Sequence, residues 1–359
     1  MRVDELSGVR RTASVALQAR GLGPNSALVI CACMRGNAAL RSLDISCNEL
    51  GPHGGAALGE ALRGNAGLTA LRLGENFLGR EGGIALALGL ENNGALSTLD
   101  LTANYLLEIS SLAAALPSTR IAELNLAQNR IGDRGCAALC AVLYETRIQH
   151  LNLSTNLLGP KSLAALADAL RVNARLEALD LSDNKLCGVG FCGEEEAPVM
   201  TAAAPATAEA LARLCDALRG GGVASLSLAD NSLGPHATAL LARGLAGNAS
   251  LTSLRLDGNG MADSGAAELA AVLEGTTIVE LGLEANGIGD QGAAKLTAAL
   301  RARLITLGAS CELAALPATK QGKEPGSSRT WRTVSPPPEQ GDLTLTLTLT
   351  LTLTLTLTL

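Results

Sequence analysis

The sequence repeats one nine-residue pattern nine times between Leu40 and Asn286. In each copy an aliphatic residue is followed at +3 and +5 by aliphatic residues and at +8 by asparagine. The asparagines follow one another at intervals of 25 to 28 residues, except for one interval of 47. Such a period is typical of a solenoid, in which each repeat buries its apolar face against its neighbours. The nine asparagines are Asn48, Asn76, Asn104, Asn129, Asn156, Asn184, Asn231, Asn259 and Asn286.

Each copy predicts a short strand followed by a helix. In the second copy Leu71 and Leu73 alternate with residues of other kinds, and this period of two is typical of a strand with one buried face. So short a strand must pair with the next copy, in parallel and through a helical crossover. Gly64 and Asn65 follow the apolar run of the first helix and predict a left-handed helix stop. The expected fold class is therefore α/β.

The asparagine column predicts a ladder of buried amides. An amide side chain carries both a donor and an acceptor, so it can bond its own loop and the adjacent turn. Replacing one of these asparagines with alanine or leucine should leave buried polar groups unpaired, at a cost of about 1–3 kcal/mol each.

The pattern resembles the leucine-rich repeat, in its long ribonuclease-inhibitor-like subtype. This subtype is similar to the repeats of the NOD-like receptors and of the Ran GTPase-activating protein. The resemblance covers roughly residues 12–307, and it implies a curved horseshoe with a parallel sheet on the concave side and helices on the convex side. The residues that carry it in the first and last copies are Leu40, Leu43, Ile45, Asn48, Leu50, Gly51, Gly55 and Ala56, and Ile278, Leu281, Leu283, Asn286, Ile288, Gly289, Gly292 and Ala293.

The pattern divides the chain into a segment at 1–11, a solenoid at 12–307, a linker at 308–342 and a tail at 343–359. The 47-residue interval holds an insertion at about 189–207, which is either a partner-contact loop or a solvated excursion. The linker is rich in Pro, Gly and Ser, so we expect it to be disordered. The tail alternates Leu and Thr, which has two interpretations. It is either an amphipathic strand or the translation of telomere-like repeat DNA.

Composition limits the partners that we expect. The net charge is −6 and there is no long run of Lys or Arg, which argues against nucleic acid and anionic membrane. No apolar segment is long enough to span a bilayer. The nine cysteines are an odd number and several replace aliphatic residues, so we interpret them as reduced side chains of a cytoplasmic protein.

The outward residues of the strands, at +2, +4 and +6 of each copy, form the predicted partner-binding site on the concave face. Acids outnumber bases there, so the expected partner is a protein with a basic patch. The face carries no Trp or Tyr, and tight binding would need many modest contacts. The candidate residues are Asp44, Arg72, Asp100, Glu123, His150, Asp180, Arg255, Asp257, Glu280 and Glu284.

No catalytic site is evident in the sequence. It contains no phosphate-binding loop, no nucleophile beside a base and no spaced set of metal ligands. We therefore predict no catalytic residue, cofactor or metal, and a non-enzymatic scaffold that binds a protein through its concave face. The alternatives are a GTPase-activating or other enzyme regulator resembling the Ran GTPase-activating protein, a detached sensor part of an immune-type receptor, and a fragment without function.

Overall fold

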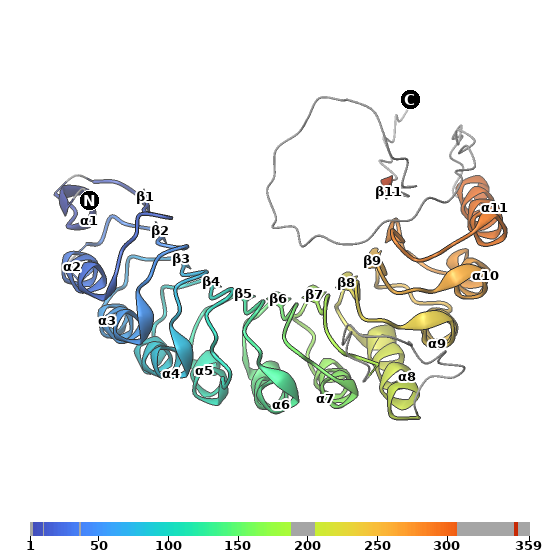
Figure 1. Ribbon diagram of the computed structural model, residues 1–359, viewed down its shortest axis with the longest axis horizontal. Coiled ribbons are helices and arrows are strands. Elements are labelled where there is room, and N and C mark those ends of the chain that lie inside the picture. The colour runs from blue at the N-terminus through green and yellow to red at the C-terminus, as the bar shows by residue number, and fades with distance from the viewer. Residues whose placement is uncertain (1–2, 10, 36, 188–204, 307–347, 351–359) are drawn as a thin grey trace, which may run out of the picture.

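The computed structural model describes residues 3–9, 11–35, 37–187, 205–306 and 348–350. Strands and helices alternate along a curved arc, with the strands on its inner side and the helices on its outer side (Figure 1). The strands form one sheet whose order follows the sequence from β1 to β11. The predicted α/β solenoid, with short parallel strands on the concave face, is confirmed.

The ten parallel strands are each three residues long, and their central residues point into the core. Leu43 of β2 faces Leu71 of β3 in register, and both are fully buried. Among these central residues only Leu281, in the last parallel strand, is half-buried. The strands are β1 (Ser14–Ala16), β2 (Ser42–Asp44), β3 (Ala70–Arg72), β4 (Thr98–Asp100), β5 (Glu123–Asn125), β6 (His150–Asn152), β7 (Ala178–Asp180), β8 (Ser225–Ser227), β9 (Ser253–Arg255) and β10 (Glu280–Gly282).

The helices pack side by side along the convex face. The interval from Asn104 to Asn129 is the shortest at 25 residues, and its helix is correspondingly short and continues into a 3₁₀ turn. The helical elements are α1 (Val3–Leu6), α2 (Pro24–Met34), α3 (Gly51–Arg63), α4 (Gly79–Leu90), α5 (Ser110–Ala115), η1 (Leu116–Ser118), α6 (Gly132–Val142), η2 (Leu143–Glu145), α7 (Pro160–Leu170), α8 (Pro205–Gly220), α9 (Gly234–Leu245), α10 (Ala262–Leu273) and α11 (Asp290–Thr306).

Glycines bring α3 and α4 into close contact. A Cβ atom added to Gly55 would lie 2.7 Å from the Cα of Gly82, and one added to Gly89 would overlap the backbone of Gly59. Real Cβ atoms do not approach other atoms so closely, so any larger residue would force the helices apart. The outer ring therefore depends on small residues at these positions.

A second column of buried asparagines lies where the helices end. The predicted left-handed stop is wrong at Gly64, whose φ is −112°. Asn65 turns the chain instead, because its Nδ2 donates to the carbonyl of Met34 in the preceding helix and its Oδ1 accepts from the N–H groups of Gly67 and Leu68. The same bond to the preceding repeat is made by Asn93, Asn173 and Asn248.

The predicted domain boundaries fall partly outside the described residues. Most of the insertion at about 189–207 and the whole linker at 308–342 lie outside them. Of the Leu-Thr tail, the structure describes β11 (Thr348–Thr350), which pairs with β10 in the antiparallel direction.

Candidate partner-binding surface

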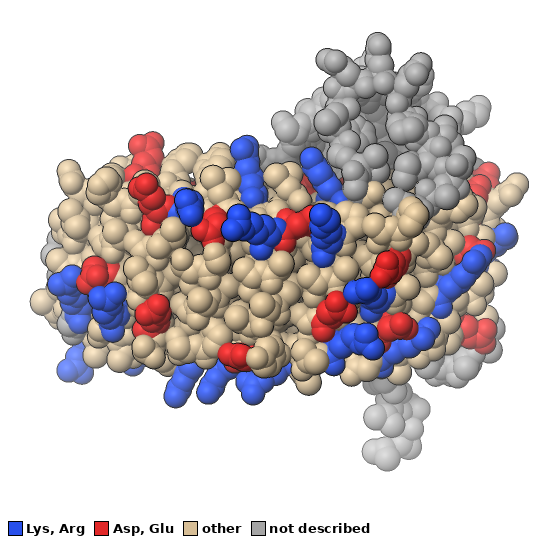
Figure 2. Space-filling model, turned by 90° about the horizontal axis from the view of Figure 1, so that it is seen from below, with Lys and Arg blue, Asp and Glu red and all other residues tan. Residues whose placement is uncertain are grey.

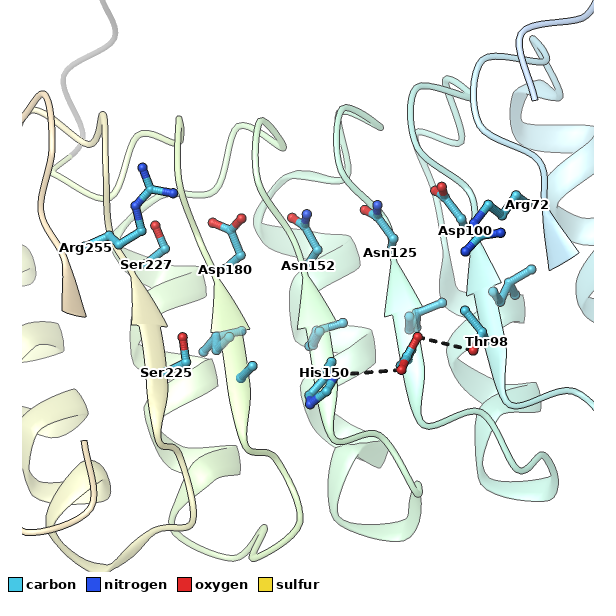
Figure 3. A pocket seen from close by; sticks show the side chains of 16 residues that line it. Arg72, Thr98, Asp100, Asn125, His150, Asn152, Asp180, Ser225, Ser227 and Arg255 are labelled. Atoms are coloured by element: carbon cyan, nitrogen blue, oxygen red, sulfur yellow. Dashed lines mark hydrogen bonds and ion pairs between the residues drawn. The ribbon is translucent and has the colours of Figure 1, made fainter. Parts of the chain in front are cut away.

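Outward side chains of strands β3 to β9 line one open hollow of about 440 Å³ on the concave face (Figure 3). Arg72 and Arg255 lie near its two ends, and the acids lie between them. The hollow brings together six of the ten predicted site residues, namely Arg72, Asp100, Glu123, His150, Asp180 and Arg255. The remaining four do not line it, and they are Asp44, Asp257, Glu280 and Glu284.

Asp100 and Asp180 use half of each carboxylate to hold the end of their own strand. Oδ1 of Asp100 accepts hydrogen bonds from the backbone N–H and the hydroxyl of Thr102, at 2.9 and 2.6 Å. Asp180 bonds Ser182 in the same way. Such local side-chain bonds fix the backbone where it leaves the sheet. The second oxygen of each carboxylate remains available to a partner. The same turn is closed by Asp44, Asn125 and Asn152.

Glu123 and His150 lie opposite each other on β5 and β6. Nδ1 of His150 is 4.0 Å from Oε1 of Glu123, and the hydroxyl of Thr98 donates to Oε2 of the same carboxylate at 3.2 Å (Figure 3). Both side chains of the Glu123–His150 pair are more than half exposed, and a separation of 4.0 Å is longer than a hydrogen bond, so the contact between them is weak. The pair can therefore exchange its mutual contact for one with a partner.

The two arginines of the hollow differ in how they are held. Nε of Arg255 lies 3.1 Å from Oδ2 of Asp257. The Asp257 side chain is only 14% exposed and also accepts the backbone N–H of Glu284, so it positions Arg255 and is not itself a contact surface. Arg72 forms no ion pair within the described residues, so its guanidinium is available to a partner.

The C-terminal half of this face is acidic. Burial raises the pKa of Asp230 above its ordinary value, and the nearby carboxylates of Asp183 and Asp257 raise it further. Asp230 and Asp183 each precede a ladder asparagine, a position that the sequence reasoning did not include in the site.

The asparagine ladder fixes the loops directly behind the strand ends. Nδ2 of Asn129 donates to the carbonyl of Leu101 in the preceding repeat and to the carbonyls of Leu126 and Ala127 in its own. Its Oδ1 accepts the backbone N–H of Asn104 at 3.0 Å. All nine ladder asparagines are buried, and the Nδ2 of each donates to a carbonyl of the preceding repeat, so these bonds support the hollow. Among the described residues, the Oδ1 atoms of Asn76 and Asn231 have no hydrogen-bond partner.

An aromatic pair at the loop edge was missed by sequence reasoning. Phe77 and Tyr105 stack with ring centroids 6.1 Å apart, and the guanidinium of Arg130 lies 5.6 Å from the centre of the Tyr105 ring. The two rings are 55% and 46% exposed. The available signal was their position, since each directly follows a ladder asparagine and they are 28 residues apart.

Within the parts of the chain that the structure describes, no group of three or more His, Cys, Asp and Glu side chains could hold a metal ion. None of the described helices has the length and apolar character required to cross a membrane.

Comparison with known proteins identifies the repeat. The family model described as Leucine Rich repeat matches residues 36–59, 121–140 and 247–270. No curated protein sequence matches the chain.

Three solved structures are similar to the chain. The leucine-rich repeat-containing protein LegL7 from Legionella pneumophila is 22% identical, with a TM-score of 0.50 over 84% of this chain and 93% of that chain. A chain of the crystal structure of the Rad7 and Elc1 complex in yeast is 16% identical, with a TM-score of 0.49 over 80% of this chain and 66% of that chain. The Leiomodin-1 Actin-Binding Site 2 structure is 14% identical, with a TM-score of 0.31 over 34% and 75%.

The likeness to LegL7 extends over most of both chains and shows a shared fold. The three family matches fall on repeats near the beginning, the middle and the end of the arc. Together they identify the chain as a leucine-rich-repeat solenoid.

Proposed function

We propose that this chain is a non-enzymatic scaffold that binds a protein partner through its concave face. The observation that carries the proposal is the hollow itself, because side chains from seven consecutive strands converge on it without enclosing it. An open, polar and rigid surface suits a protein partner better than a small ligand, which needs a site that buries most of its surface. Leucine-rich-repeat proteins generally act as protein-interaction scaffolds, and this supports the proposal.

The charges of the hollow favour a partner with a basic patch. Asp100, Glu123 and Asp180 lie between Arg72 and Arg255. Each Asp keeps one carboxylate oxygen that its own turn does not use. A basic patch on the partner would face these acids, while the two arginines would limit how far that patch extends. The arrangement therefore favours a partner whose positive charges face the acids and do not face the two arginines.

The repeat dimensions favour the ribonuclease-inhibitor-like subtype. Most intervals are 27 or 28 residues, and most repeats carry a full α-helix such as α3 or α9.

The cysteines favour a cytoplasmic location. Seven cysteines of the described residues are free thiols, and burial raises the pKa of Cys31 and Cys215 to about 12. Buried thiols such as these two are inert, and a set of free thiols suits a reducing compartment.

The proposal is tested by affinity capture with the full chain and the variant Asp100→Asn/Glu123→Gln/Asp180→Asn. Asparagine keeps the Oδ1 acceptor that closes each turn, so the backbone stays in place while three negative charges are lost. A partner that binds through the acids should be recovered with the wild-type chain and be depleted from the variant. Quantitative mass spectrometry of the two captures measures the difference.

A control variant removes the same charge from the helical side. Glu60→Gln/Glu91→Gln/Glu274→Gln changes three exposed glutamates outside the hollow. A concave-face partner should bind this variant as it binds the wild type. Recovery of every captured protein with the concave-face variant at wild-type levels would contradict the proposal.

A further inference from the structure

Three arginines stand in one column at the edge where the chain enters the strands. Arg120, Arg147 and Arg175 each directly precede the first aliphatic residue of a repeat, and all three are exposed. We call the surface that they line the arginine groove. Figure 2 shows Lys and Arg side chains projecting from the lower edge of the molecule in that view. The groove shares no lining residue with the concave hollow.

These arginines have no acidic partner within the residues that the structure describes. Several arginines elsewhere on the surface are paired with acids, for example Arg63 with Glu60 and Arg243 with Glu268. The chain carries a net charge of −6, so acids are abundant. Three like charges in successive repeats repel one another, and their repulsion would be relieved by a negatively charged ligand.

The groove itself has a volume of about 730 Å³ and a floor of small residues. Gly94, Ala95, Ala122 and Ala174 lie among the residues that line it. Glu177 also lines it, but its Oε1 accepts a hydrogen bond at 3.1 Å from Nε2 of Gln149. The floor leaves room for a backbone to lie across the repeats, with guanidinium groups along its length.

We infer that the arginine groove binds an acidic segment of a protein partner in an extended conformation. Neighbouring strands of a sheet lie about 4.8 Å apart, so Arg120 and Arg175 are anchored about 10 Å apart along the arc. Alternate side chains of an extended peptide are about 6.7 Å apart, which is more than the spacing of about 4.8 Å between neighbouring arginines. The long, flexible arginine side chains can span this difference. Arginine binds carboxylates through paired hydrogen bonds, which suits Asp or Glu at alternate positions.

A peptide fits the groove better than single-stranded nucleic acid does. No aromatic side chain lines the groove, and proteins that bind single strands stack the bases on aromatic rings. The negative charge of the whole chain also repels a long polyanion, whereas a short acidic segment meets only the local arginines.

The test is fluorescence anisotropy with a labelled oligo-glutamate peptide and the full chain at low salt. The variant Arg120→Gln/Arg147→Gln/Arg175→Gln should bind the peptide at least about fivefold more weakly, because three exposed charge pairs are lost. The control Arg63→Gln/Arg219→Gln/Arg243→Gln has the same net charge of −9, which is −6 less three positive charges, and should bind like the wild type.

Three results would overturn the inference. The first is no binding of the peptide to the wild-type chain at low salt, and the second is equal weakening in both variants. The third is a labelled oligothymidylate that binds more tightly than the peptide and is lost in the groove variant, since it would assign the groove to nucleic acid. Circular dichroism of both variants separates a lost contact from a lost fold.

Discussion

Oδ1 of Asn129 accepts a hydrogen bond at 3.0 Å from the backbone N–H of Asn104, one repeat earlier in the chain. The same relation joins Asn104 to Asn76 and Asn156 to Asn129. Each ladder amide therefore closes its own turn and also fixes the neighbouring turn. The turns of neighbouring repeats are therefore linked by hydrogen bonds, so the loss of one ladder asparagine should destabilise two repeats.

Replacement of Asn129 by leucine should lower the free energy of unfolding by at least about 2 kcal/mol, because the buried N–H of Asn104 and several carbonyls lose their partner. Urea denaturation monitored by circular dichroism measures the loss. Asn125→Leu is the control, since Asn125 is half-exposed on β5 and closes only one local turn. Its expected loss is below about 1 kcal/mol. Equal losses in the two variants would contradict a special role for the ladder.

Substitution of Gly89 by alanine should destabilise the solenoid by about 1–3 kcal/mol, since the new methyl would overlap the backbone of Gly59 and push α4 away from α3. Alanine is otherwise favoured over glycine in a helix by roughly 1 kcal/mol, so the sign of the change distinguishes packing from helix propensity. Gly94→Ala provides the comparison, because a Cβ at Gly94 meets no atom within 4 Å. Thermal unfolding measures the melting temperatures of both variants, and only Gly89→Ala should show a clear decrease.

Sequence reasoning predicted the strands and the ladder well because both follow from local chemistry. The central leucines, such as Leu71, are set by the alternation that a half-buried strand requires. Asn76 occupies the fixed place where the backbone leaves the sheet, and its bonds need only the adjacent repeat. The same rule placed the nine strands from β2 to β10 in register.

Features that depend on stacking between repeats were harder to predict. Asn65 follows a glycine and suggested a helix stop, whereas its partner is a carbonyl 31 residues earlier. Phe77 and Tyr105 are unremarkable singly and become a pair only through the register of β3 and β4. The curvature of the arc decides which outward residues share the hollow, and no single repeat encodes that curvature.

Leu107 occupies a backbone position that other repeats give to glycine. Its φ is +57°, and Gly79 and Gly132 at the same place in their repeats have φ of +62° and +63°. A side chain in this left-handed region costs roughly 1–2 kcal/mol. Leu107→Gly should therefore raise the free energy of unfolding by about 0.5–1 kcal/mol, since Leu107 is 52% exposed and loses little packing.

The reverse change, Gly132→Leu, should lower the free energy of unfolding by about 1–2 kcal/mol, although a Cβ there meets no atom within 4 Å. Denaturant titration of the two single variants tests the pair together. A stabilised Gly132→Leu, or a Leu107→Gly that loses more than about 1 kcal/mol, would show that packing and not backbone strain controls this column.

Replacement of Asp230 by asparagine should raise the melting temperature at neutral pH. Burial and the carboxylates of Asp183 and Asp257 raise the pKa of Asp230 in the folded state. The folded chain therefore holds this proton more tightly than the unfolded chain, and folding is disfavoured as pH rises from the ordinary carboxyl pKa through the raised value. The advantage of Asp230→Asn should be largest above the raised pKa and should shrink as the pH falls through it.

Glu91→Gln neutralises an exposed carboxylate elsewhere and should show no comparable pH-dependent gain. Calorimetric melting temperatures at a series of pH values measure both variants, and a gain for Asp230→Asn that grows towards acid would reverse the assigned sign.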